Sequence, residues 1–331
     1  MANLNLTTTS AGSAVLIGGA ANDSLNINLV GPFWGGTGTG SGIFVSENGA
    51  TGADLLRIAI DATTGGILNN FIGINAGVGA DRLIVNLDAA SSVNSNSMYM
   101  LGGAGNDTLQ LNIAAMDDVN INTITMSGAS GADILKLNID AGSDVTGNAI
   151  NMYGFTSSTS GAAVDFADTM QLNIEASDDV SNNWISMQGG AGNDTLRVAI
   201  DDMGHLTDAR GTYWSVAGDF SNNSITMFGG AGADRLIASI DFSGHSDFYN
   251  NDINMHGSAG VDNLLLDVYA GVSGSSFDYN DFSMFGGSGN DIIKMAVNVD
   301  MVADDSATIY SNDFSMTGGS GNDVMNMAVN M

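Results

Sequence analysis

The sequence is organised around one glycine-rich stretch, GGAGNDTL, at residues 102–109. The same pattern recurs in full at residues 189–196, 229–236, 286–293 and 318–325, and weaker copies lie between them. The aspartate of the pattern occurs at Asp23, Asp54, Asp81, Asp107, Asp133, Asp168, Asp194, Asp234, Asp262, Asp291 and Asp323. The shortest spacing between these aspartates is 26 residues, and longer spacings contain insertions. A period of this length indicates a stacked repeat protein.

Two alternating apolar patterns accompany each copy. Residues two, four and six positions after the aspartate are apolar, as in Leu109, Leu111 and Ile113. A second alternation ends seven residues before the aspartate, as in Met98 and Met100. Strict period-two alternation predicts strands with one buried face, so the methionines are expected in the core. We therefore expect an all-β fold, a single elongated β-solenoid of about eleven coils, each coil with two strands.

The repeat extends along the whole chain, which predicts one solenoid domain over residues 1–331. Each coil of such a protein rests only on its neighbours, so length does not require a second domain. Insertions lengthen the repeat near residues 31–46, 155–166 and 201–220. Loops that project from a rigid scaffold often carry specificity. Tolerated decoration is an equally good interpretation of these three.

A column of asparagines marks the opposite turn of the coil. It lies four residues before the methionine column and is kept in nine consecutive repeats, at Asn70, Asn96, Asn122, Asn148, Asn183, Asn223, Asn251, Asn280 and Asn312. In-register amide side chains stabilise stacked strands by hydrogen bonding from one strand to the next. We expect a structural amide ladder here.

Composition excludes several classes of function. The chain of 331 residues has 36 acidic and 7 basic residues, a net charge of −29, which argues against nucleic acid and anionic membrane surfaces as partners. It has no cysteine, so disulfides and thiolate chemistry are absent. No apolar run approaches the roughly 18 residues of a membrane span. The N-terminal residues show no basic segment or apolar core, so no classical signal peptide is expected.

The glycine-rich unit resembles the nonapeptide of RTX-type calcium-binding proteins, Gly-Gly-x-Gly-x-Asp-x-apolar-x. Several copies depart from it: Ala21, Ala129 and Ser258 each replace one glycine, and the copy at Asp168 keeps none. The family packs two nonapeptides into each short coil, whereas here one occurs per 26 residues. The resemblance implies Ca²⁺ between turns stacked at one corner. It also implies an extracellular or cell-surface protein, exported by a type I-like route without a cleaved signal.

The predicted calcium ligands are the motif aspartates other than the one at the degenerate turn. They are Asp23, Asp54, Asp81, Asp107, Asp133, Asp194, Asp234, Asp262, Asp291 and Asp323. Carboxylates stacked about 4.8 Å apart repel one another, and calcium accepts both carboxylates and backbone carbonyls. The alternative is that each aspartate only accepts hydrogen bonds from N–H groups of its own turn.

A second acidic set follows the longer strand. It comprises Asp61, Asp88, Asp140, Glu175, Asp201 and Asp241, together with the pairs Asp117-Asp118 and Asp178-Asp179. The simpler interpretation is an acidic turn exposed to solvent. The more specific one is that cations weakly bridge these residues laterally. Catalysis finds no support, because His205, His245 and His256 share no spacing and no nucleophile or zinc motif appears. We expect no enzyme activity, and no cofactor other than Ca²⁺.

Both ends of the sequence keep the strand pattern, so uncapped ends and head-to-tail stacking into a homopolymer are expected. Outward apolar residues such as Leu101, Tyr153, Phe228 and Phe285 could form a lateral patch. The predicted function is a self-assembling structural subunit of an extracellular filament, matrix fibre or surface layer, with possible cell-surface contacts. The alternatives are a monomeric RTX-type adhesin or ice-binding module and, less favoured, an exported RTX enzyme.

Overall fold

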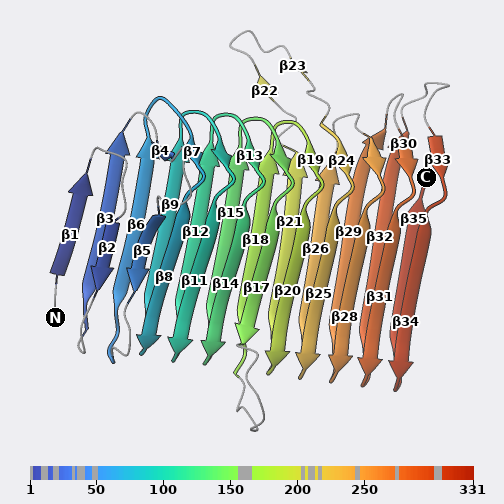
Figure 1. The fold of residues 1–331 in the computed structure, drawn as a ribbon. Coiled ribbons are helices and arrows are strands. Elements are labelled where there is room, and N and C mark those ends of the chain that lie inside the picture. The colour runs from blue at the N-terminus through green and yellow to red at the C-terminus, as the bar shows by residue number, and fades with distance from the viewer. Residues whose placement is uncertain are drawn as a thin grey trace.

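The structure is a computed structural model. It describes residues 3–8, 14–17, 22–31, 34–35, 42–46, 51–155, 166–202, 206–207, 213–214, 218–242, 247–272, 276–301 and 308–331. Most of the strands belong to three parallel sheets that are connected by turns, and successive coils lie side by side along a rod (Figure 1). The all-β solenoid expected from the sequence is confirmed. In the part of the chain described here, no helix has the length and apolar character of a membrane span.

The first sheet, sheet A, contains the strands that follow the glycine-rich turns. It is twelve-stranded, and each strand pairs in parallel with the corresponding strand of the next coil. Its strands are β1 (Asn3–Thr8), β3 (Ser24–Gly31), β6 (Leu55–Ala62), β9 (Arg82–Ala89), β12 (Thr108–Ala115), β15 (Ile134–Ala141), β18 (Thr169–Ala176), β21 (Thr195–Asp202), β26 (Arg235–Phe242), β29 (Asn263–Val272), β32 (Ile292–Met301) and β35 (Val324–Asn330).

The second sheet, sheet B, contains the strands that precede the glycine-rich turns. It is eleven-stranded. Its strands are β2 (Ala14–Ile17), β5 (Gly42–Ser46), β8 (Phe71–Val78), β11 (Ser97–Ala104), β14 (Thr123–Ser130), β17 (Ala149–Phe155), β20 (Trp184–Ala191), β25 (Ser224–Ala231), β28 (Asp252–Ala259), β31 (Asp281–Ser288) and β34 (Asp313–Ser320).

A third sheet, sheet C, lies in the longer turn, where the sequence predicted no strand. Its ten strands are β4 (Trp34–Gly35), β7 (Ile67–Leu68), β10 (Val93–Asn94), β13 (Val119–Asn120), β16 (Val145–Thr146), β19 (Val180–Ser181), β24 (Phe220–Ser221), β27 (Phe248–Tyr249), β30 (Ser276–Asp278) and β33 (Thr308–Tyr310). The expectation of two strands per coil was therefore wrong. Strands of two or three residues are too short to show an alternating pattern, and those from β7 to β30 each contribute one buried apolar side chain, such as Val119.

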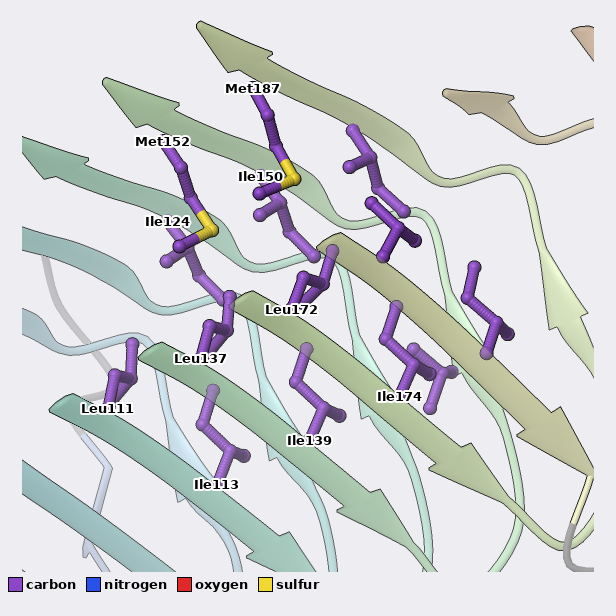
Figure 2. Close-up of a cluster of buried hydrophobic side chains, with 14 of the residues drawn as sticks. Leu111, Ile113, Ile124, Leu137, Ile139, Ile150, Met152, Leu172, Ile174 and Met187 are labelled. Carbon is purple, nitrogen blue, oxygen red and sulfur yellow. The ribbon is translucent and has the colours of Figure 1, made fainter. Parts of the chain in front are cut away.

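The core is a continuous apolar column between sheets A and B. Figure 2 shows Leu111 and Ile113 of β12 and Met152 of β17 among the side chains that fill it. The methionines in the middle of the sheet B strands lie in the core, as the buried Met126 and Met152 illustrate. Because identical positions stack from coil to coil, a flexible thioether can take up small differences between neighbouring coils. The predicted core role of these methionines is confirmed.

The three predicted insertion regions lie partly outside the described residues. In the first, two segments belong to the solenoid itself as strands β4 and β5, so the repeat continues through it. In the second, residues 156–165 are not described. In the third, β22 (Leu206–Thr207) and β23 (Tyr213–Trp214) form an antiparallel pair that projects from the rod (Figure 1).

The asparagine column is the predicted ladder. The backbone N–H of Asn96 donates to Oδ1 of Asn122 (2.9 Å), and Nδ2 of Asn96 donates to the same oxygen (3.0 Å). Nδ2 of Asn122 also donates to the carbonyl of Val93 in the preceding coil (2.7 Å). The same contacts recur from Asn70 to Asn312. Every amide atom of the ladder has a partner, so the prediction is confirmed.

Candidate metal centre

The motif aspartates form a second column at the glycine-rich corner, where sheet B turns into sheet A. From Asp23 to Asp291 each of these residues is at most 4 % exposed. This burial places carboxyl groups inside the coil, beside the apolar core. Ionised groups in such a place require compensation by hydrogen bonds, a proton or a cation.

One oxygen of each aspartate is used in a ladder. The backbone N–H of Asp107 donates to Oδ1 of Asp133 (2.7 Å), and this contact repeats without interruption from Asp23 to Asp323. The alternative drawn from the sequence was that each aspartate accepts hydrogen bonds from N–H groups of its own turn, and it was wrong about the donor. Because the coils stack in register, the donor is the backbone N–H of the aspartate in the neighbouring coil.

The other oxygen, Oδ2, has a different environment. It is buried, and it has no hydrogen-bond partner among the described residues at Asp54, Asp81, Asp107, Asp234, Asp262 and Asp291. A buried polar atom without a partner is uncommon in folded proteins and calls for an explanation. An ion that occupies the corner would supply one.

The first glycine of the motif makes room for this oxygen. A Cβ placed on Gly102 would lie 2.5 Å from Oδ2 of Asp107 and 2.9 Å from the carbonyl oxygen of Gly128 in the next coil. Gly257 has the same two neighbours, Oδ2 of Asp262 at 2.5 Å and the carbonyl of Gly286 at 2.6 Å. A carboxylate oxygen of one coil and a carbonyl oxygen of the next therefore approach the same point.

The second glycine of the motif is required for its backbone conformation. Gly103 and Gly190 have φ of 108° and 115°, in the region that side chains disfavour. The two copies that lack this glycine keep the conformation, since Ala129 has φ of 84° and Ser258 has φ of 85°. These two departures from the family pattern change the side chain and keep the backbone conformation, while Ala21 lies outside the described residues.

Asp168, which the sequence left out of the predicted site, belongs to the column. It is buried, and it bonds to its neighbours in the ladder as the other aspartates do. Gly154 takes the place of its first glycine, because a Cβ on Gly154 would collide with Oδ2 of Asp168. The insertion between these two residues separates the halves of the motif, so the spacing could not reveal it.

Burial changes the acidity of the column. It raises the pKa of Asp107, Asp234 and Asp262 to about 6, against the lowering effect of the hydrogen bond from the neighbouring backbone N–H and with a further increase from adjacent carboxylates. The same causes raise the pKa of Asp81. Asp107, Asp234 and Asp262 therefore change between the protonated and the charged form near pH 6.

These features fit calcium. The corner offers only oxygen donors, an unpartnered carboxylate oxygen and a nearby carbonyl, and calcium prefers this set in flexible geometry. The glycine column leaves the space that a side chain would fill. The ten predicted ligands all lie in this one column, Asp323 in the last coil being only half-buried. Calcium binding by each of them stays a prediction.

A smaller acidic group lies at the opposite corner, before the sheet C strands. Carboxylate oxygens of Asp144, Asp178 and Asp179 lie within 4.8 Å of one another and could hold a metal ion. Burial, followed by the charge of neighbouring aspartates, raises the pKa of Asp178. The sequence identified the pair Asp178-Asp179 but missed Asp144, because only the stacking of β16 beside β19 brings it close.

The remaining acidic residues of the second set point outward from the ends of the sheet A strands. Asp140, Glu175 and Asp201 pair in register, and all three are exposed. They form a solvated acidic edge, which agrees with the simpler interpretation of the sequence.

The fold and this corner define a class: a parallel β-solenoid with stacked Gly-rich turns and an inward column of aspartates. The family model of the RTX calcium-binding nonapeptide repeat (four copies) matches residues 99–112, 186–198 and 283–294. The chain carries RTX calcium-binding nonapeptide repeats, and the matched ranges contain Asp107, Asp194 and Asp291 of the column. No curated protein and no solved structure matched the chain.

Proposed function

We propose that this protein is a calcium-stabilised structural subunit outside the cell. The observation that carries the proposal is the buried Oδ2 column, which has no hydrogen-bond partner among the described residues at Asp54, Asp81, Asp107, Asp234, Asp262 and Asp291. RTX repeats indicate a secreted protein, and extracellular fluids are generally richer in calcium than the cytosol. The type I-like route of export stays a prediction.

Bound calcium would supply positive charge to carboxylates that otherwise repel one another. At one site, Asp107 and the carbonyl of Gly128 in the next coil would hold a calcium ion. At another site, Asp262 and the carbonyl of Gly286 would do the same. Each ion would then connect neighbouring coils, because its ligands come from both. Rigidity along the rod would depend on calcium concentration.

We also propose that subunits associate head to tail into filaments. Met325 and Met327 of β35, at an edge of sheet A, are 52 % and 43 % exposed at positions where other coils bury their apolar residues. A second solenoid stacked on this strand would cover them and pair its backbone groups. The −29 charge opposes association, so calcium or salt should promote it.

A non-catalytic role is part of the proposal. Of the three histidines, His256 alone lies among the described residues, where it stacks on Phe228 and meets Phe285 edge-on. An ice-binding role would favour a regular Ser/Thr face. The outward column containing Thr125 and Ser186 is interrupted by Asn151.

Electron microscopy of the purified protein with calcium and with a chelator tests the proposal. Met327→Asp adds one charge to the exposed strand, and Val261→Asp, at a residue that is also exposed, adds the same charge far from it. We expect filaments in calcium for the wild type and Val261→Asp, and short species for Met327→Asp. Monomers of the wild type at every calcium concentration would overturn the structural role and favour a monomeric adhesin.

A further inference from the structure

Two outward rows in the middle of sheet B are free of charge from β8 to β34, while the outward row before them carries Asp252, Asp281 and Asp313. Two positions of each strand point outward in its middle, and they stack in register from coil to coil. The first row is Gly73, Tyr99, Thr125, Asn151, Ser186, Thr226, Asn254, Ser283 and Ser315, and the second is Asn75, Leu101, Ser127, Tyr153, Gln188, Phe228, His256, Phe285 and Thr317. None of these side chains is acidic, and none is Lys or Arg.

The two central rows differ in charge from the rows around them. The outward rows of sheet A carry Lys136, Arg197, Asp140 and Glu175, and the chain as a whole has 36 acidic residues. The two rows themselves offer a charged partner no ion pair, which favours an uncharged partner. His256 is consistent with this, since burial lowers its pKa.

Flat aromatic rings stand along the strip. Phe228 stacks on His256 with ring centroids 4.9 Å apart, and His256 meets Phe285 at 6.1 Å. Tyr99 of the first row is also exposed, and Phe71 and Trp184 are exposed in the neighbouring row, Trp184 to 64 %. Large apolar side chains gathered on an exposed surface mark interaction sites.

We propose that this strip, the sheet B face, binds a neutral polysaccharide that runs along the solenoid axis. Sugar rings have apolar C–H faces that stack on aromatic rings, and hydroxyl edges that hydrogen-bond to hydroxyl and amide side chains. The two rows supply both kinds of group side by side. Coils repeat about every 4.8 Å, close to the length of one sugar residue in an extended chain. One sugar would therefore meet one coil.

A second copy of this chain fits the strip less well. The row containing Ser186 and Thr226 would lose water on association and would need matched partners. The −29 charge of each copy also opposes face-to-face approach. A sugar chain brings its own hydroxyls and no charge. A sugar chain therefore avoids both unpaired hydroxyl groups and charge repulsion.

Pull-down on microcrystalline cellulose, a neutral glucan, and titration with cellohexaose test the proposal, with anionic alginate as the comparison polysaccharide. The variants are Phe228→Ala with Phe285→Ala, and separately Trp184→Ala in another coil. The matched control is Tyr269→Ala, because Tyr269 on sheet A is 37 % exposed, as is Phe228. All experiments use calcium-loaded full chain, with melting temperature and β-sheet circular dichroism as checks of folding.

We expect wild type and Tyr269→Ala to bind cellulose and cellohexaose and to leave alginate unbound. The double variant should lose roughly ten-fold or more in affinity, and Trp184→Ala should also bind more weakly. Equal binding by all variants, binding to alginate alone, or no binding to either neutral glucan would overturn the proposal. So would loss of self-association in the double variant without any glucan binding. Filament formation, tested with Met327→Asp, is scored separately and does not decide this result.

Discussion

Asp107 and Asn122 occupy corresponding places in two ladders, and their side chains differ at a single terminal position. Nδ2 of Asn122 donates to the carbonyl of Val93 and to Oδ1 of Asn148. Oδ2 of Asp107 is equally buried but has no hydrogen-bond partner in the part of the chain that the structure describes. At the asparagine corner, hydrogen bonds within the protein therefore satisfy the side-chain amide. At the aspartate corner, Oδ2 requires a proton or a cation.

Asp107→Asn should reverse its effect on stability when calcium is added. Without calcium, the amide keeps the Oδ1 contact to the N–H of Asp81 and can donate to the nearby carbonyl of Gly128, so we expect stabilisation by about 1 kcal/mol. With calcium, the variant loses a charged ligand and should melt below wild type. Thermal melts in chelator and in millimolar calcium measure both effects.

Asp201→Asn is the control for this prediction. It removes the same charge from an exposed position on β21, so both melts should stay close to wild type. A destabilised Asp107→Asn variant in chelator would show that the carboxylate has a partner in the metal-free protein.

Ile121 is a second residue at odds with its surroundings. Its φ is 55°, in the left-handed region that β-branched side chains disfavour, and its side chain is 67 % exposed. Corresponding positions in other coils hold Asn69, Gly147 and Asn182, residues that tolerate this conformation.

Ile121→Asn should therefore stabilise the protein by about 1 kcal/mol. Asn182→Ile, the reverse change one position before the same ladder, should destabilise it by a similar amount. Urea unfolding followed by circular dichroism measures both. If the two changes shift the midpoint in the same direction, the left-handed conformation is not what matters at this turn.

At the scale of the elements, the long strands, the asparagine ladder and the aspartate column could be predicted from the sequence. The hydrogen bonds within the aspartate column and sheet C could not. Eight-residue strands such as β12 and β15 show full alternation, and recurrence in successive repeats reveals the Asn and Asp columns. Strands of two residues, such as β13, leave one apolar residue in a polar turn. Similarly, Gly154 and Asp168 lie at one turn although their separation in the sequence departs from the motif spacing.

Asn223→Ala should cost about 1–3 kcal/mol, because it leaves the buried carbonyl of Val180 and the N–H of Asn183 without partners. Asn26→Ala, on the outward side of β3, should cost under about 0.5 kcal/mol. Denaturant titration of both variants checks the difference. Equal shifts would remove the ladder as a source of stability.

At the scale of the whole molecule, the aspartate column predicts an inverted pH dependence. Because burial raises the pKa of Asp107, Asp234 and Asp262 to about 6, the folded protein binds more protons than the unfolded chain. This stability is fully present below about pH 4, the unfolded value, and is lost as pH rises through about 6. In chelator, the melting temperature should therefore fall between pH 4 and pH 7.

Replacing these three aspartates by asparagine should flatten the dependence. The control variant replaces three outward residues, Asp88, Asp140 and Asp267, by asparagine. It removes the same charge from the surface and should change the pH dependence of the melting temperature much less. A melting temperature that rises from pH 4 to pH 7 in chelator would mean that the column is charged and compensated within the protein.

Calorimetric calcium titration at pH 7 tests the central claim most directly, with wild type compared to the Asp107→Asn, Asp234→Asn, Asp262→Asn variant. The account predicts several calcium ions bound at millimolar concentration or below, accompanied by proton release and a higher melting temperature, and fewer ions bound by the variant. Absence of binding by wild type, or equal stoichiometry in the folded variant, would contradict the assignment of calcium to this column.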